Sequence, residues 1–279
     1  MRINSFLVIA FASCLVGSRV SLAGNATRPQ LAGKTSGAGL DLSRLKELDN
    51  PSRTPVQHAN LGLRLYRDEM VTPTPRPGPP YTSIVTHDYV LAQITRKLAE
   101  SDADAATLRK TWERMNPGEV KDSLTIALLL RDVQRDVQQA KLKSKKATGE
   151  SAEADPKLRD DLRTKVSAYV VDRRHPLRLR ELGIVALGKL AVQENDATIG
   201  PTLAQVIRED VQGHYKAAAD GKGVSGRVLV FPVRRAAAEA IQAMDKAGML
   251  LESYVTAAAK QAQFEVKLPP VPVRPAATK

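Results

Sequence analysis

The sequence has almost no cysteine and few aromatic residues. Cys14 is the single cysteine among 279 residues, which excludes an internal disulfide framework and any cysteine-based zinc finger. Aromatic residues make up only 4% of the chain, so a core has to be built from alanine, leucine, valine and isoleucine. Such a core suits closely packed helices better than an aromatic-rich sheet.

Acidic residues are also in short supply relative to basic ones. The chain has 42 Lys and Arg against 30 Asp and Glu, and its formal net charge is +12. Hydrophobic residues make up 43% and charged residues 26%, the balance of an ordinary globular protein. The positive excess fits a partner with phosphates or an acidic surface, or simply a solvated face that keeps the protein soluble.

Residues 1–23 have the pattern of a secretory signal peptide. Arg2 precedes a short apolar run over residues 6–16, and residues 21–23 place small side chains before a cleavage point. The run is shorter than the roughly 20 apolar residues that span a bilayer. A buried N-terminal helix is the weaker alternative, because Arg19 and the polar residues after it form no packed element. We therefore expect an exported protein, periplasmic or secreted, with no transmembrane span after signal removal.

Cys14 raises the alternative that the exported protein is anchored to a membrane by a lipid. Residues 11–14 are similar to a bacterial lipoprotein box, in which the cysteine is lipidated, although Phe11 stands where an aliphatic residue is usual. Cleavage after Ala23 instead removes Cys14 and leaves a chain without cysteine, which packing alone must hold together.

Composition divides the rest of the chain into three regions. Residues 24–80 are rich in glycine, proline, serine and threonine, so we expect an extended N-terminal region. Short helical patterns at residues 42–48 and 61–66 interrupt it, and either could dock on the main body. Residues 81–265 are expected to form a helical-repeat domain, and residues 266–279 a proline-rich tail.

Apolar residues in the central region recur with helical spacing. Pro117, Pro176 and Pro232 lie just ahead of apolar faces, where helices begin, and Gly248 follows one of these faces as a stop. Residues 228–231 alternate with period two, but we expect this segment to be too short to anchor a sheet. The predicted class is all-α. The spacing is clearest in two sets, Leu124, Ala127, Leu128 and Leu130, and Leu179, Leu182, Ala186, Leu187 and Leu190.

Three segments of the central region align with one another. Residues 120–128, 179–187 and 233–241 each open with an aliphatic and a basic residue and close with alanine followed by leucine or isoleucine. The basic residues are Lys121, Arg180 and Arg234. Small residues within each segment let a neighbouring helix approach closely, and another apolar-faced helix follows each segment.

These segments resemble the HEAT repeat. Residues 231–244 and 179–190 match the motif of its first helix, and residues 201–207 match the motif of its second. The resemblance implies a short right-handed α-solenoid of stacked helical pairs, because one unit cannot bury its apolar face alone. It also implies that Arg180 and Arg234 are structural, forming an ion pair or capping a neighbouring turn. Insertions around residues 141–157 and 212–229 make the repeats longer than usual, and an irregular helical bundle is the alternative fold.

No set of residues predicts catalysis. Residues 221–226 satisfy G-x-G-x-x-G, but no strand–helix unit surrounds them, so we expect a loop between helices. The four histidines, at positions 58, 87, 175 and 214, are widely separated and lack metal-ligand spacing. A serine-nucleophile motif is also missing. We therefore expect neither enzymatic activity nor a cofactor nor a metal.

Basic residues gather near the predicted repeat starts, and there we expect a strip that binds a partner. The expected function is a non-catalytic, exported scaffold for an acidic or envelope-associated protein. The alternative is a basic HEAT-like nucleic-acid-binding protein, as in some alkylpurine DNA glycosylases, but the signal peptide and the single tryptophan, Trp112, argue against it because bases stack on aromatics. A third hypothesis, bilin lyase activity, rests only on the occurrence of related repeats in phycobilisome lyases. The strip comprises Arg173, Arg174, Arg178, Lys222, Arg227 and Arg235.

Overall fold

The structure is a computed structural model, and it describes residues 42–71, 73, 86–143, 156–217 and 227–268. Helices make up most of these residues. All of these residues belong to one unit, residues 37–279. The predicted signal peptide, Cys14, Lys222 and most of the proline-rich tail lie outside them. The helices are η1 Leu42–Asp49, α1 Pro55–Val71, α2 His87–Glu100, α3 Ala105–Arg114, α4 Glu119–Lys143, α5 Pro156–Val171, α6 Leu177–Glu194, η2 Ala197–Ile199, α7 Gly200–Glu209, α8 Pro232–Lys246 and α9 Ser253–Gln261.

The predicted helix starts and the predicted stop are confirmed. Pro232 occupies the first position of α8, where its missing N–H is not needed, and Pro176 is the N-cap of α6. Gly118 has a φ of 156° immediately before α4. Gly248 has a φ of 78° two residues after the end of α8, in the left-handed region that favours glycine.

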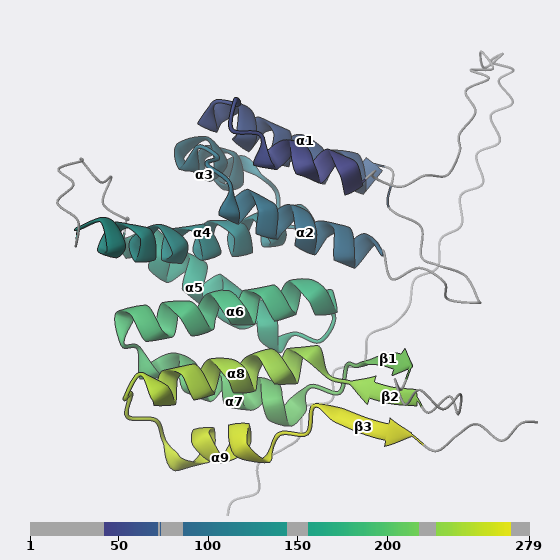
Figure 1. The fold of residues 1–279 in the computed structure, drawn as a ribbon, viewed down its shortest axis with the longest axis vertical. Coiled ribbons are helices and arrows are strands. Elements are labelled where there is room, and N and C mark those ends of the chain that lie inside the picture. The colour runs from purple at the N-terminus through teal and green to yellow at the C-terminus, as the bar shows by residue number, and fades with distance from the viewer. Residues whose placement is uncertain (1–41, 72, 74–85, 144–155, 218–226, 269–279) are drawn as a thin grey trace, which may run out of the picture. The chain divides into compact units, whose positions relative to one another are not determined.

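The helices form two rows. Helices α2, α4, α6 and α8 lie side by side in that order, and α5, α7 and α9 lie against them (Figure 1). After each of α4, α6 and α8, the next α-helix in the chain is one of the second row. The mainly helical class is therefore as predicted.

Small residues bring neighbouring helices close together. A Cβ atom on Gly188 of α6 would lie 2.6 Å from the Cβ of Ala240 in α8. A Cβ on Gly183, five residues earlier, would lie 2.9 Å from Cγ1 of Val170 in α5. Both distances are shorter than real Cβ contacts, so α6 can pack this tightly against two partners only with glycine at these positions.

The helical body begins earlier in the chain than residue 81. Helices η1 and α1 lie within the region expected to be extended, and both contribute to the core. Leu65 and Tyr66 of α1 are fully buried. The Tyr66 hydroxyl donates a hydrogen bond to Oγ1 of Thr95 in α2, at 2.8 Å, so α1 is held by a buried polar contact as well as by apolar packing.

A small sheet lies beside the helices, and the expectation that residues 228–231 could not anchor one was wrong. The sheet has three antiparallel strands in the order β1 His214–Ala217, β2 Arg227–Val230 and β3 Glu265–Leu268. Strand β2 is central, and Leu229 pairs with Tyr215 on one side and Val266 on the other. Four residues suffice here because a strand remote in sequence supplies the second set of backbone partners.

Candidate functional site

The basic residue that opens each aligned segment binds the end of the preceding helix. Lys121 Nζ donates to the carbonyl oxygen of Met115, the C-cap of α3, at 2.7 Å. Arg234 Nε donates to the carbonyl oxygen of Asp210, the C-cap of α7. Carbonyl groups at a helix C-terminus have no partner within the helix, so each contact satisfies one of them and places a cation at the negative end of the helix dipole.

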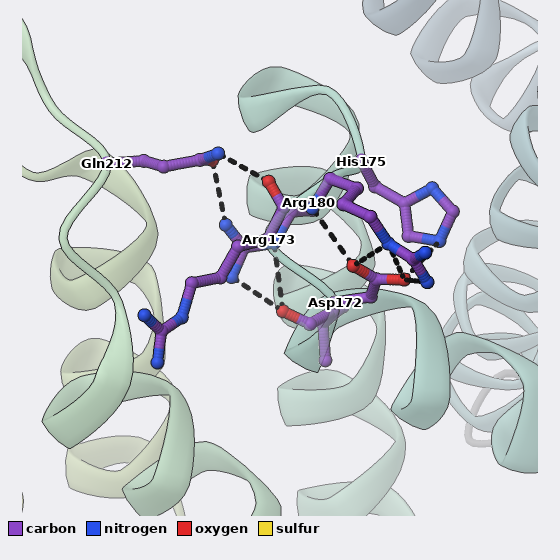
Figure 2. Close-up of polar contacts among 7 residues, drawn as sticks. Asp172, Arg173, His175, Arg180 and Gln212 are labelled. Carbon is purple, nitrogen blue, oxygen red and sulfur yellow. Dashed lines mark hydrogen bonds and ion pairs between the residues drawn. The ribbon is translucent and has the colours of Figure 1, made fainter. Parts of the chain in front are cut away.

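Arg180 makes the equivalent contact and is buried. Its Nε and Nη2 donate to the carbonyl oxygen of Val170, in the last turn of α5, at 2.9 and 2.8 Å. Its Nη1 donates to Oε1 of Gln212 at 3.0 Å and lies 3.1 Å from Oδ2 of Asp210. Gln212 also donates to the carbonyl oxygen of Arg173, which ties the α5–α6 loop to the end of α7 (Figure 2). The expectation that Arg180 and Arg234 cap a turn or form an ion pair is confirmed.

Each described arginine of the predicted basic strip has a carboxylate partner. Arg173, Arg174 and Arg178 lie together around the α5–α6 loop and the first turn of α6, whereas Arg235 lies on α8. Lys222 and the side chain of Arg227, the first residue of β2, lie outside the described part of the chain. Much of the positive charge is therefore compensated locally. The pairs are Arg173–Glu209 at 3.6 Å, Arg174–Asp172 at 2.6 Å, Arg178–Glu181 at 2.9 Å and Arg235–Glu265 at 2.8 Å.

The strongest of these surface pairs is that between Arg174 and Asp172. The guanidinium binds both carboxylate oxygens, and the backbone N–H of Arg174 donates to the same side chain at 2.9 Å. These hydrogen bonds hold the pKa of Asp172 far below its usual range. The Arg174 side chain is 89% exposed, so this pair orders the loop rather than the core.

A polar cleft of about 900 Å³ opens where the starts of α2, α4 and α6 meet. The sequence gives no hint of this convergence, because the residues come from segments far apart in the chain. We call this hollow the polar cleft. Its polar side chains are His87, Asp88, Glu119, Asp122, Arg174, His175 and Gln212.

His87 holds one wall of the polar cleft together. Its Nδ1 lies 2.7 Å from Oε1 of Glu69, a fully buried side chain of α1, and its Nε2 lies 3.4 Å from Oε2 of Glu119. Burial alone would lower the pKa of His87, but the hydrogen bond with Glu69 and the charge of Glu119 outweigh it and raise the pKa above its usual value. The imidazole of His87 thus joins α1, α2 and α4.

A smaller hollow of about 390 Å³ adjoins the polar cleft and shares Asp122 and His175 with it. The ring of Tyr169, in α5, lines this hollow and stacks on the His175 ring at a centroid distance of 3.9 Å. Tyr169 is 6% exposed, and its buried hydroxyl has no hydrogen-bond partner among the described residues. Burial raises the pKa of Asp122, whose carboxylate makes no hydrogen bond or ion pair with any described residue.

An apolar groove of about 870 Å³ runs along the first row of helices. Its floor is made of small and aliphatic side chains, and Val192 on its rim is 38% exposed. Glu100, Lys189 and Glu239 supply the charges at its edge. We call this feature the apolar groove. Its apolar lining comes from α4, α6 and α8, with Val133, Val185, Gly188, Val192, Ala236, Ala240 and Ala243.

Comparison with known proteins adds no identity: no family model, curated protein or solved structure matches this chain. Within the described ranges, no group of three or more His, Cys, Asp and Glu side chains could hold a metal ion. A helix long and apolar enough to cross a membrane is likewise missing from the described residues. The polar cleft and the apolar groove are the two candidate sites on the described part of the chain.

Proposed function

We propose that this protein is a non-catalytic, exported scaffold that binds a partner protein in the apolar groove. The observation that carries the proposal is the groove itself, an apolar surface of small and aliphatic side chains along three consecutive first-row helices. Side chains of this kind are normally buried, and a contiguous apolar surface on a folded protein is typical of an interaction site.

A HEAT-like solenoid is the architecture that we propose for this scaffold. The three aligned segments lie in α4, α6 and α8, and Lys121, Arg180 and Arg234 make the same kind of contact with the preceding helix. Equivalent residues in equivalent contacts support a structural repeat, beyond an irregular bundle of helices. Stacked repeats produce an extended surface, and a groove lined by three successive first-row helices fits such a surface.

The occupant that we propose is an amphipathic helix of a partner protein with basic residues beside its apolar face. A floor that contains Gly188, Ala236 and Ala240 lets a helix approach closely, since interaxial distances fall to about 8 Å where side chains are small. The charged residues of the lining are two acids, Glu100 and Glu239, and one base, Lys189. The rim is therefore negative overall and favours a basic flank.

The basic strip gives weaker support for partner binding than we expected from the sequence, because its described arginines are paired with carboxylates. Arg173, Arg174 and Arg178 would have to release Glu209, Asp172 and Glu181 before they could bind an acidic partner. The same pairing weakens the nucleic-acid-binding alternative, which needs cations free to contact phosphates.

Binding of a model helix tests the proposal. The probe is a fluorescein-labelled amphipathic peptide with a leucine and alanine face and lysine flanks, followed by fluorescence anisotropy. We expect Val192→Glu to weaken binding at least about tenfold, because it buries a charge in an apolar contact. Val56→Glu is the matched control, since Val56 is 48% exposed on α1 and lies away from the groove lining.

Three outcomes contradict the proposed occupant. Equal affinity of wild type and Val192→Glu would show that the groove is not the binding surface. Equal affinity for a peptide with glutamate flanks would remove the argument from rim charge. A wild-type dimer that Val192→Glu converts to a monomer, measured by analytical ultracentrifugation, would assign the groove to a second copy of this chain.

Export is tested separately from binding. We expect a C-terminally tagged chain to accumulate outside the cytoplasm, shortened by cleavage after Ala23, when fractions are compared by immunoblotting and mass spectrometry. A variant with Arg2 and the apolar run of residues 6–16 replaced by polar residues should remain inside the cell. A full-length cytosolic wild-type product would contradict export and would favour the nucleic-acid alternative.

A further inference from the structure

We propose that the polar cleft binds an alkylammonium group, such as that of a lysine side chain or a polyamine. This inference is independent of the apolar groove, because the two hollows share no lining residue. It concerns residues from α2, α4 and α5 that the proposed scaffold function does not use.

Two half-buried carboxylates in the polar cleft have no hydrogen-bonded or ion-paired partner among the described residues, although the charges of His175 and Lys121 act on one of them, Asp122. Asp88 and Asp122 line the cleft, and neither side chain makes a hydrogen bond or an ion pair with another described residue. Other acids in this part of the molecule are paired, as Glu69 is with His87 and Asp172 is with Arg174. A half-buried carboxylate without a partner is costly, so these two are placed to receive a cation.

The helix dipole by itself gives a structural reason for acidic residues at positions 88 and 122, without any bound ligand. Asp88 and Asp122 lie in the first turns of α2 and α4, where a negative charge is favourable to the helix dipole. The dipole explains acidic residues at these positions, but it does not explain the buried hydroxyl, without a partner among the described residues, in the hollow that Asp122 also lines.

Tyr169 provides evidence for a ligand that is independent of the two acids. Its side chain lines the hollow that contains Asp122, and its hydroxyl is buried without a hydrogen-bond partner among the described residues. Burial raises the pKa of Tyr169, and the charges of Asp122, Glu119 and Asp88 raise it further, so the hydroxyl lies within the field of these carboxylates. A neutral phenol in this position can accept a hydrogen bond from a cation that the carboxylates attract.

The set of acceptors fits a primary ammonium. The carboxylates of Asp88 and Asp122 and the hydroxyl oxygen of Tyr169 come from α2, α4 and α5, and an ammonium group has three N–H donors. The nearby basic groups contact other residues. Lys121 binds the carbonyl oxygen of Met115, and Arg174 binds Asp172. His87 lies against Glu69 and Glu119, and His175 lies 3.8 Å from Asp172. The described residues offer no metal-ligand group here, which favours an organic cation over a divalent ion.

Calorimetric titration of the full chain tests the proposal. The probes are spermidine, the peptide Gly-Lys-Gly with blocked termini, and Gly-Gln-Gly as the uncharged match, all at constant ionic strength. We expect spermidine and Gly-Lys-Gly to bind and Gly-Gln-Gly not to bind. A tighter Gly-Lys-Gly complex assigns the site to a protein partner, and a tighter spermidine complex assigns it to a small molecule.

Matched variants separate a site from general charge attraction. We expect Asp122→Asn to weaken binding at least about tenfold, the loss typical of a charge-assisted hydrogen bond. Asp245→Asn, which makes the same change at an exposed position of α8, should leave binding within about twofold. An equal loss in both variants would overturn the proposal, as would the absence of binding in the wild type.

Tyr169→Phe provides the readout that a merely structural tyrosine would not give. Because the hydroxyl has no hydrogen-bond partner among the described residues, we expect its removal to leave the urea midpoint unchanged or to raise it. The same variant should weaken spermidine or Gly-Lys-Gly about threefold to tenfold, since one acceptor is lost. A lowered urea midpoint with unchanged affinity would show that the hydroxyl serves the fold, and would overturn the proposal.

Discussion

Arg180 and Asp210 form an ion pair in the interior of the protein, with 3.1 Å between Nη1 and Oδ2 and with each side chain only 1% exposed. Asp210 is the C-cap of α7, and its backbone carbonyl oxygen accepts a hydrogen bond from Arg234 of α8. The end of α7 is therefore held by α6 through its side chain and by α8 through its backbone. This junction couples three helices, so its loss should affect the whole stack.

We expect Arg180→Ala to lower the free energy of unfolding by about 3–5 kcal/mol, because it leaves Asp210 as a buried charge without a partner. The double variant with Asp210→Ala should lose less than the sum of the two single variants, which urea unfolding followed by circular dichroism will measure. Arg178→Ala is the matched control. Its ion pair with Glu181 is 40% and 33% exposed, so we expect a change below about 1 kcal/mol.

Arg180 illustrates which features of the structure could be predicted from the sequence and which could not. Helical spacing and prolines are local signals, so the starts of α4, α6 and α8 followed directly from residues that are adjacent in the chain. The resemblance of the aligned segments to HEAT repeats predicted a structural Arg180, and the contact with Val170 agrees with it. What no local signal could supply was the identity of Asp210 as the partner, because only the packing of α7 on its neighbours brings it there.

The features that the sequence missed all depend on residues remote from one another. Strand β2 is stabilised by pairing with β3, whose first residue, Glu265, also neutralises Arg235. The polar cleft and the hollow beside it bring together His87, Asp122 and Tyr169 from three helices, and no local pattern in the sequence links these residues. A tyrosine on an otherwise apolar helix face was the one available signal, since its hydroxyl needs a partner.

Helix approach at Gly188 leads to a second stability prediction. Gly188→Ala places a methyl group against Ala240, where a Cβ would be 2.6 Å away, so α6 and α8 have to move apart. We expect a loss of about 1–3 kcal/mol in urea unfolding, the usual cost of overpacking, despite the better helix propensity of alanine. Lys189→Ala, at the next and exposed position, should change stability by less than about 0.5 kcal/mol. Equal stability of both variants would contradict the close packing of α6 on α8.

The clamp around His87 makes stability depend on pH. Burial lowers the pKa of His87, but the contacts with Glu69 and Glu119 outweigh this and leave it raised above 6.5 in the folded protein. A histidine whose pKa is raised on folding stabilises the folded state. This stabilisation is complete at pH values below the pKa of the unfolded state, and it is lost as the pH rises through the pKa of the folded state. We therefore expect the wild type to lose stability between pH 6 and pH 8, and His87→Gln to lose less over the same interval. Urea midpoints that shift equally in both proteins would show that the imidazolium is not what joins α1, α2 and α4.

The arginines at the α5–α6 loop give the last prediction, which concerns the basic strip. Because Arg173, Arg174 and Arg178 each have a carboxylate partner, the local net charge is close to zero and long-range attraction of an anion is weak. We expect the triple change of these arginines to glutamine to alter affinity for a labelled polyglutamate peptide or duplex DNA by less than about threefold, measured by fluorescence anisotropy at constant salt. A loss above tenfold for the peptide would restore the strip as the surface for an acidic partner. The same loss for DNA alone would instead favour the nucleic-acid-binding alternative, since paired arginines would then have exchanged their carboxylates for phosphates.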